Sequence, residues 1–360
     1  IDVYNKKIPA ERHLGLFALY VSFFPQLVAG PIERASTLLP QFRNLYKFDY
    51  KRVTNGLKLM TWGLFKKVVI ADNIATLITP IFTTPTNYNG LPLLIATILF
   101  AFQILCDFSG YSDIAIGCAE VMGIKLMKNF DRPYFARSIP EFWTRWHISL
   151  STWFRDYLYI PLGGNRVIAW RWYYNIFIVF LVSGIWHGAN WTFVIWGALH
   201  AFYMMSSKFF IPIRSYIYRL SNAKHHPNLL SILQQSLTFS LVCFAWIFFR
   251  ANTVSDALYI AQTVPKTLAQ LTYSVITLNS DAVAAIVKGQ GLMALIRKLP
   301  IIVSGILIME GVYYWGRNES VRDRLSKLSL PIRWACYYFL IISIFLFGHF
   351  GKMEFIYFQF

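Results

Sequence analysis

The chain has 360 residues, of which 56% are hydrophobic and only 14% charged, and its mean hydropathy is +0.45. Soluble domains carry about 25% charged residues, so this composition excludes an ordinary water-soluble enzyme. The net charge of +17 lies between apolar runs and accompanies no nucleic-acid-binding motif. We therefore expect no nucleic-acid partner, and a lipid bilayer with anionic headgroups instead.

Stretches of membrane length recur along the whole chain. A membrane helix needs about 20 mostly apolar residues, and eight segments are candidates: 13–32, 59–82, 92–123, 173–187, 190–211, 229–249, 299–316 and 334–349. The fourth is short for a crossing, and the third is long enough to be tilted or broken. Without internal repeats or a domain boundary, the sequence predicts a single domain over 1–360, an all-α multi-pass helical bundle.

The basic residues predict how this bundle is oriented. Of the 34 Lys and Arg, 22 lie in one set of alternate connections and nine in the other, and cytoplasmic loops carry the excess. Both termini of this chain are then expected to face outward. The chain begins with Ile1 instead of Met, so we also expect further spans upstream in the full-length protein.

Two connections are unusual. Residues 124–172 should be cytoplasmic, yet they are too aromatic for a solvated loop, so we expect them to lie at the interface or to re-enter the membrane. Their aromatic residues include Trp143, Trp146, Trp153, Phe154, Tyr157 and Tyr159. Residues 251–298 form a weakly amphipathic outer connection.

Ionisable residues inside a membrane are costly to bury and are functional candidates for that reason. The spans hold Asp107, Asp113, Glu120, His187, His200 and Glu310. Asp107 and Asp113 flank Gly110, either as substrate contacts or as a polar patch that packs the bundle. His200 stands alone and is interpreted as a core histidine with satisfied hydrogen bonds.

His187 follows Trp186 in a turn that also contains Gly184 and Gly188. The glycines allow backbone or substrate to approach closely, and an imidazole can act as a base near neutral pH. A helix end anchored at the membrane interface by Trp and His would look the same. The composition of the turn leaves both readings open.

A second cluster spans 141–164. If its start is helical, Trp143 and His147 share a face, and Ser149 follows as a further substrate-contact candidate. Arg155 beside Asp156 is expected to form a buried, charge-neutral pair. An interfacial amphipathic helix with snorkelling arginines is the alternative.

The cysteines do not indicate a metal or disulfide site. Cys106, Cys118, Cys243 and Cys336 lie in apolar surroundings without a CxxC pair, and we interpret them as small buried hydrophobes. We expect neither a metal nor a bound cofactor.

These residues together resemble a known family, the membrane-bound O-acyltransferases, in the bacterial branch that contains alginate O-acetylase and the D-alanyl transfer protein of teichoic acid modification. The resemblance runs through 23–34, 107–113, the stretch around His147, the His187 turn and 354–360. It implies that His187 is the catalytic histidine and that His147 occupies the family's upstream Asn/His position. Residues 25–34 and 357–360 look closer to alginate O-acetylase.

What the resemblance implies about activity is transfer of an acyl group, acetyl above all, from a cytoplasmic thioester such as acetyl-CoA to an extracytoplasmic polysaccharide hydroxyl. It also implies location in the bacterial cytoplasmic membrane and an extracytoplasmic esterase-like partner protein. D-alanyl transfer to teichoic acids and peptidoglycan O-acetylation are the alternatives within the family. Outside it, a proton-coupled transporter would use Asp107, Asp113 and His187 as a relay, and a structural subunit would tolerate histidine substitutions.

Overall fold

The computed structural model describes residues 1–28, 30–88, 90–210, 227–277, 292–351 and 355, and within these ranges it contains helices and no strand. The first half comprises α1 (Leu14–Ser22), α2 (Phe24–Leu27), α3 (Ala35–Phe42), α4 (Tyr50–Leu64), the π-helix η1 (Phe65–Ala71), α5 (Asp72–Thr83), the 3₁₀ turn η2 (Pro85–Asn87) and α6 (Leu91–Val121). Short elements follow: the 3₁₀ turn η3 (Pro133–Phe135), α7 (Ile139–Arg145), α8 (Ile148–Phe154) and the π-helix η4 (Arg155–Tyr159). The remaining helices are α9 (Ala169–His187), α10 (Trp191–Phe209), α12 (Pro227–Arg250), α13 (Val254–Ile276), α15 (Leu292–Trp315), α16 (Val321–Lys327) and α17 (Leu330–Phe347).

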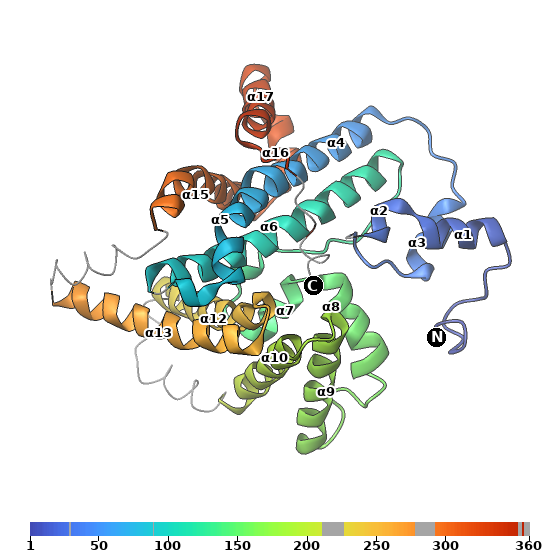
Figure 1. Ribbon diagram of the computed structural model, residues 1–360. Helices are drawn as coiled ribbons and strands as arrows, with labels where there is room; N and C mark the ends of the chain where they lie inside the picture. Colours follow the sequence, from blue (N-terminus) through green and yellow to red (C-terminus); the bar gives the residue numbers. More distant parts are fainter. Residues whose placement is uncertain (29, 89, 211–226, 278–291, 352–354, 356–360) are drawn as a thin grey trace.

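The long helix α6 lies at the centre, with α4 alongside it (Figure 1). Two glycine pairs, spaced by seven residues on each helix, allow the two backbones to touch. A Cβ on Gly63 would lie 2.5 Å from the Gly110 carbonyl oxygen, and one on Gly117 would lie 2.6 Å from the Gly56 carbonyl oxygen. Seven residues are about two helical turns, so both pairs fall on one crossing line.

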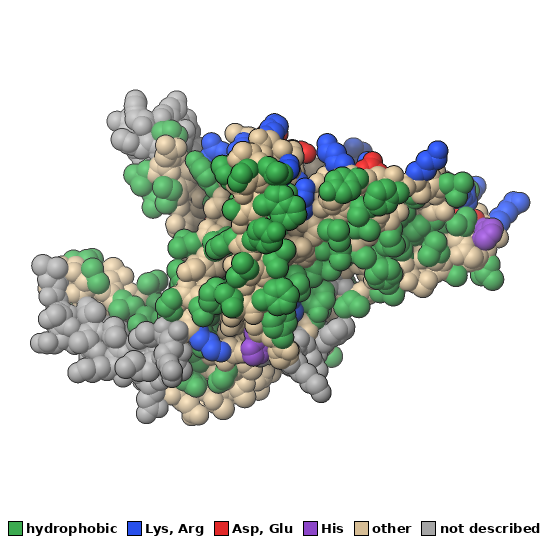
Figure 2. Space-filling model, turned by 90° about the horizontal axis from the view of Figure 1, so that it is seen from above, with side chains coloured by type: hydrophobic (Ala, Val, Ile, Leu, Met, Phe, Trp, Pro, Cys, Tyr) green, Lys and Arg blue, Asp and Glu red, His purple; other side chains and the backbone are tan. Residues whose placement is uncertain are grey.

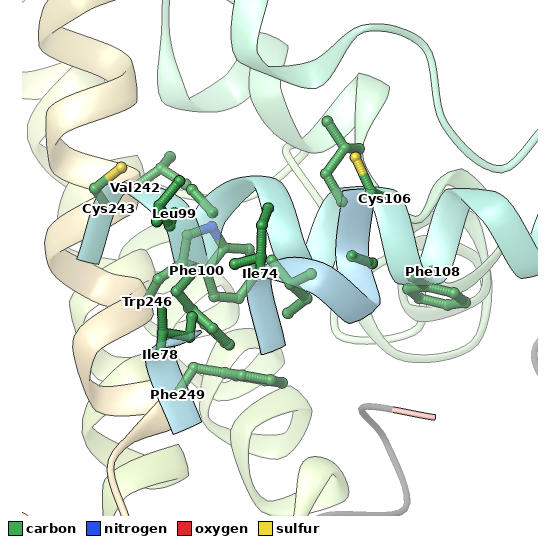
Figure 3. Packing of buried hydrophobic residues seen from close by; sticks show 14 of the residues in the cluster. Ile74, Ile78, Leu99, Phe100, Cys106, Phe108, Val242, Cys243, Trp246 and Phe249 are labelled. Atoms are coloured by element: carbon green, nitrogen blue, oxygen red, sulfur yellow. The ribbon is translucent and has the colours of Figure 1, made fainter. Parts of the chain in front are cut away.

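The main core forms where α5, α6 and α12 meet (Figure 3). Ile74 and Ile78 of α5 face Phe100 of α6, and Trp246 and Phe249 of α12 close the group. All five side chains are almost completely buried. This core holds α12 against α6, α10 packs on α12, and α9 in turn packs on α10.

Four described helices are long and apolar enough to cross a membrane: Leu91–Met122, Pro227–Arg250, Lys298–Trp315 and Leu330–Phe347. Hydrophobic side chains cover much of the face seen in Figure 2, and Lys and Arg gather toward its edges. Most of α6 is buried, whereas few residues of Lys298–Trp315 in α15 and of α17 are buried, as in lipid-facing helices. The chain is thus an all-helical membrane protein, but the eight predicted spans are not confirmed.

Several segments differ from the prediction. Residues 13–32 break into α1 and α2, because Pro25 lacks the N–H that a continuous helix needs. The stretch 92–123, expected to be tilted or broken, is not broken: it forms the single 31-residue helix α6, Leu91–Val121. Of the cysteines, Cys106 and Cys243 are buried, but Cys118 is partly exposed and Cys336 is exposed, so the prediction of four buried thiols is wrong for these two.

Candidate active site

His187 is the last residue of α9, at the turn that leads into α10. The two helices cross tightly there, since a Cβ on Gly184 would lie 2.4 Å from the Phe193 carbonyl oxygen. Gly188 is similarly close to the Phe193 ring. Both glycines therefore serve contact between α9 and α10.

The His187 ring lies against aromatic side chains from α10 and α12. Ring centroids are 5.1 Å away for Trp196, 5.1 Å for Phe249 and 5.2 Å for Trp186. Trp186, a candidate substrate contact, is 55% exposed. It therefore contacts the His187 ring from the exposed side of the turn. Asn190 secures the turn by donating from Nδ2 to the Asn252 carbonyl oxygen at 3.0 Å.

His147 lies between α7 and α8 and is 5% exposed. Its backbone is left-handed, with φ 42° and ψ 55°, a region in which Asn and His are several-fold enriched among non-glycine residues. The helix α7 has already ended at Arg145. The expectation that Trp143 and His147 share one helical face is therefore wrong.

A buried hydrogen-bond network holds the His147 turn in place. Asn129 Oδ1 accepts from Ser149 Oγ at 2.9 Å, and Asn129 Nδ2 donates to Ser112 Oγ at 3.1 Å. The Asn129 carbonyl oxygen also accepts from the Ile148 amide at 2.9 Å. Ser149, a candidate for substrate contact, thus positions the turn, and Asn129 is a site residue that no periodicity in the sequence indicates.

The two histidines belong to one aromatic-lined region although 40 positions separate them. The His147 ring packs on Phe108 at 4.5 Å. Ring contacts of 5.1 to 6.4 Å then lead from His147 to His187 through Phe130, Trp146, Trp246 and Phe249. Burial lowers the pKa of His147, which lies outside the four spanning helices, and the nearby His187 lowers it further. A neutral imidazole at His147 can donate one hydrogen bond and accept another.

A buried charge network lies beside this region, on η1 and α6. Lys67 Nζ is 2.6 Å from Asp107 Oδ1 and 2.8 Å from Asp72 Oδ1. Lys66 Nζ is 2.8 Å from Asp113 Oδ2. Asp107 and Asp113 therefore neutralise buried lysines, as a polar patch that packs the bundle would; their role as substrate contacts stays a prediction. The sequence shows Lys66 and Lys67 within an apolar stretch. It does not show which carboxylates pair with them.

The Arg155–Asp156 pair exists but is not buried. Arg155 Nε lies 2.8 Å from Asp156 Oδ1, and the two side chains are 59% and 32% exposed. Asp156 Oδ2 also pairs with Arg34 Nη2 at 3.1 Å. Both groups lie on the π-helix η4, which presents them at the surface, so the predicted burial is wrong.

His200 is a core residue, as expected, but it is not satisfied. It is fully buried on α10 among aromatic rings, including Trp143 and Trp196 at 5.0 Å each. Neither ring nitrogen has a hydrogen-bond partner among the described residues. Among all the residues that the structure describes, no group of three His, Cys, Asp or Glu could hold a metal ion.

Comparison with known proteins identifies relatives of this chain. It is 44% identical over 244 residues to a peptidoglycan O-acetyltransferase of Helicobacter pylori, covering 67% of this chain and 45% of that protein. It is 42% identical over 257 residues to the probable alginate O-acetylase AlgI of Pseudomonas aeruginosa, covering 71% and 47%. A teichoic acid D-alanyltransferase of Bacillus subtilis is 29% identical over 259 residues, covering 68% and 62%.

The chain thus spans about half the length of the two O-acetyltransferase relatives. The sequence model of the membrane-bound O-acyltransferase family matches residues 13–250, a range that contains both histidines of the aromatic-lined region. The resemblance found in the sequence is confirmed: this chain belongs to the membrane-bound O-acyltransferase family.

Proposed function

We propose that this protein transfers an acetyl group from a cytoplasmic thioester donor, such as acetyl-CoA, to a hydroxyl group of an extracytoplasmic polysaccharide. One observation carries the proposal: the fold brings His147 and His187 into the same aromatic-lined region from separate elements. The names of the relatives support O-acetylation of a polysaccharide, alginate or peptidoglycan, as the activity. The same relatives favour an enzyme over a proton-coupled transporter.

In the proposed reaction His187 is the general base. Its ring accepts the proton of the acceptor hydroxyl while the oxygen attacks the thioester carbonyl carbon. As the C–S bond breaks, the imidazolium returns that proton to the departing thiolate, which leaves as a free thiol. The new C–O bond is the acetyl ester.

His147 orients the donor in this scheme. A hydrogen bond from its neutral ring to the thioester carbonyl oxygen stabilises the charge that develops there during attack. Asn129 and Ser149 position the turn that presents this ring. We place the enzyme in the bacterial cytoplasmic membrane, with an esterase-like partner protein on the outer side to receive or deliver the polymer.

The test is acetyl transfer by membrane vesicles that carry His187→Gln. Glutamine keeps hydrogen-bonding groups but cannot accept a proton at neutral pH, so transfer should fall by about 10²–10⁴-fold at unchanged protein abundance. His13→Asn is the matched control, because His13 only caps α1 at the exposed end of the chain and asparagine is also a good cap. Near-normal transfer by the Gln variant would show that His187 is an interfacial anchor.

A further inference from the structure

Arg250 is a buried cation without a counter-ion among the residues that the structure describes. It is the last residue of α12 and is 7% exposed. No carboxylate of the described chain pairs with it, and its Nε has no hydrogen-bond partner there. Its guanidinium carbon lies 5.4 Å from the centre of the Phe82 ring.

The two other buried cations in the described ranges are paired with carboxylates. Lys66 and Lys67 each lie within 2.8 Å of a carboxylate oxygen. A buried charge is normally paired because desolvation is costly, and the face of a phenylalanine ring compensates only partly. A neutral side chain at position 250 would avoid this desolvation cost and favour folding. We infer that the arginine serves a purpose other than stability.

The position of Arg250 points to that use. Its neighbour Phe249 is one of the rings in contact with His187, at 5.1 Å. Two residues further on, the Asn252 carbonyl oxygen accepts the hydrogen bond from Asn190 in the His187 turn. The end of α12 and the catalytic turn are therefore joined directly.

We propose that Arg250 binds an oxyanion, a carboxylate or phosphate group, of the polymer that accepts the acyl group. The planar guanidinium fork matches such groups with two parallel hydrogen bonds. The distribution of basic residues predicts that the connection after α12 lies on the outer side of the membrane, the side from which the proposed acceptor comes. This inference rests on the proposed function and specifies its substrate class: an anionic polymer whose hydroxyl meets His187 while its charged group meets Arg250.

Binding of two fluorescent oligosaccharides to the chain in lipid nanodiscs tests the proposal. One is an oligouronate, and the other is the same oligomer with its carboxyl groups reduced to alcohols. Wild-type protein should prefer the anionic oligomer. Arg250→Gln should lose about tenfold or more in affinity for the anionic oligomer alone, Arg250→Lys should lose less, and the exposed control Arg137→Gln should lose nothing.

Thermal unfolding separates binding from folding. Removal of an unpaired buried charge should leave the melting temperature unchanged or raise it. If Arg250→Gln lowers the melting temperature and weakens both oligomers equally, Arg250 is structural and the proposal is wrong. Equal affinity of wild type and Arg250→Gln for the oligouronate overturns it too.

A lipid phosphate is the competing source of the oxyanion. If nanodiscs of phosphatidylglycerol, compared with phosphatidylcholine, abolish the oligouronate preference, the arginine serves lipid and not the acceptor. His187→Gln should keep the preference for the anionic oligomer, because this assay contains no acyl donor and measures binding, which does not require a general base. A preference without any acetyl transfer by wild type would therefore contradict the proposed function and support the oxyanion site.

Discussion

Gly63 and Gly110 bring α4 and α6 into backbone contact, with room for no side-chain atom between them: a Cβ on Gly63 would lie 2.5 Å from the Gly110 carbonyl oxygen. Close approach through small residues is a common way to pack helices inside a membrane, where apolar burial contributes little to association. This contact between α4 and α6 therefore requires glycine, whose side chain is a single hydrogen atom, at both positions.

Gly63→Ala should destabilise the protein, because one methyl group forces the helices apart. Overpacking of this kind costs about 1–3 kcal/mol, visible as a lower melting temperature in detergent. Gly311→Ala is the control, since a Cβ there meets nothing within 4 Å, and alanine gains about 0.5–1 kcal/mol over glycine inside a helix. Equal effects of the two substitutions would contradict the contact.

Lys66→Met should leave the Asp113 carboxylate without its cation. Removal of one partner of a buried pair costs about 3–5 kcal/mol, reduced here because Asp113 is 23% exposed. Lys66→Met combined with Asp113→Leu should recover most of the loss. A double-mutant cycle of unfolding free energies measures the coupling, and additive effects would mean that the pair does not stabilise the fold.

His147→Gly should distinguish the role of the imidazole ring from that of the backbone conformation. Glycine adopts the left-handed conformation without strain, whereas the imidazole is lost. We expect folded protein in normal amounts but transfer reduced by about 10²–10³-fold, as for loss of one donor to a developing oxyanion. His147→Asn, also suited to this conformation and equipped with a donor, should retain more activity. Wild-type rates in the glycine variant would remove His147 from the chemistry.

Asp156→Ala should change protein abundance little. Both of its arginine partners are at least partly exposed, and exposed ion pairs contribute about 0–1 kcal/mol. Quantitative immunoblotting of membranes checks this. A large loss of folded protein would show that Arg34, Arg155 and Asp156 form a stronger network than their exposure indicates.

Cysteines placed at Arg137 and Arg166 should resist labelling by an impermeant maleimide added to intact cells, since the excess of basic residues predicts that 124–172 is cytoplasmic. Permeabilised cells should label both positions, since Arg137 and Arg166 are exposed in the structure. Efficient labelling of intact cells would reverse the predicted orientation.

Long apolar runs were predicted well because composition alone determines them. The helices α6, α12, α15 and α17 lie where the sequence placed spans. Both histidines were identified as candidates, since an ionisable ring in an apolar stretch is visible in the sequence. Their proximity was not predicted, because the family resemblance implied only which family positions the two histidines occupy.

What the sequence could not show depends on backbone conformation and long-range pairing. The left-handed φ of His147 ends the helical face that its spacing to Trp143 suggested. Asn129 acts through hydrogen bonds to a turn about 20 residues away, which leaves no periodic pattern. In the sequence, Arg250 is only one of the nine basic residues in the outer connections, and the lack of a partner among the described residues becomes apparent only when its surroundings are known.

The lysine–aspartate network also constrains how the protein is made. An isolated lysine or aspartate costs about 2.5–3.5 kcal/mol at the centre of a bilayer. It is therefore unfavourable to insert the segment with Lys66 and Lys67 by itself, and equally unfavourable to insert the segment with Asp107 and Asp113 by itself. Together they neutralise one another. We therefore expect the ribosome-bound chain to retain residues 50–88 in the translocon until α6 has emerged, and both helices to enter the membrane as one preassembled hairpin.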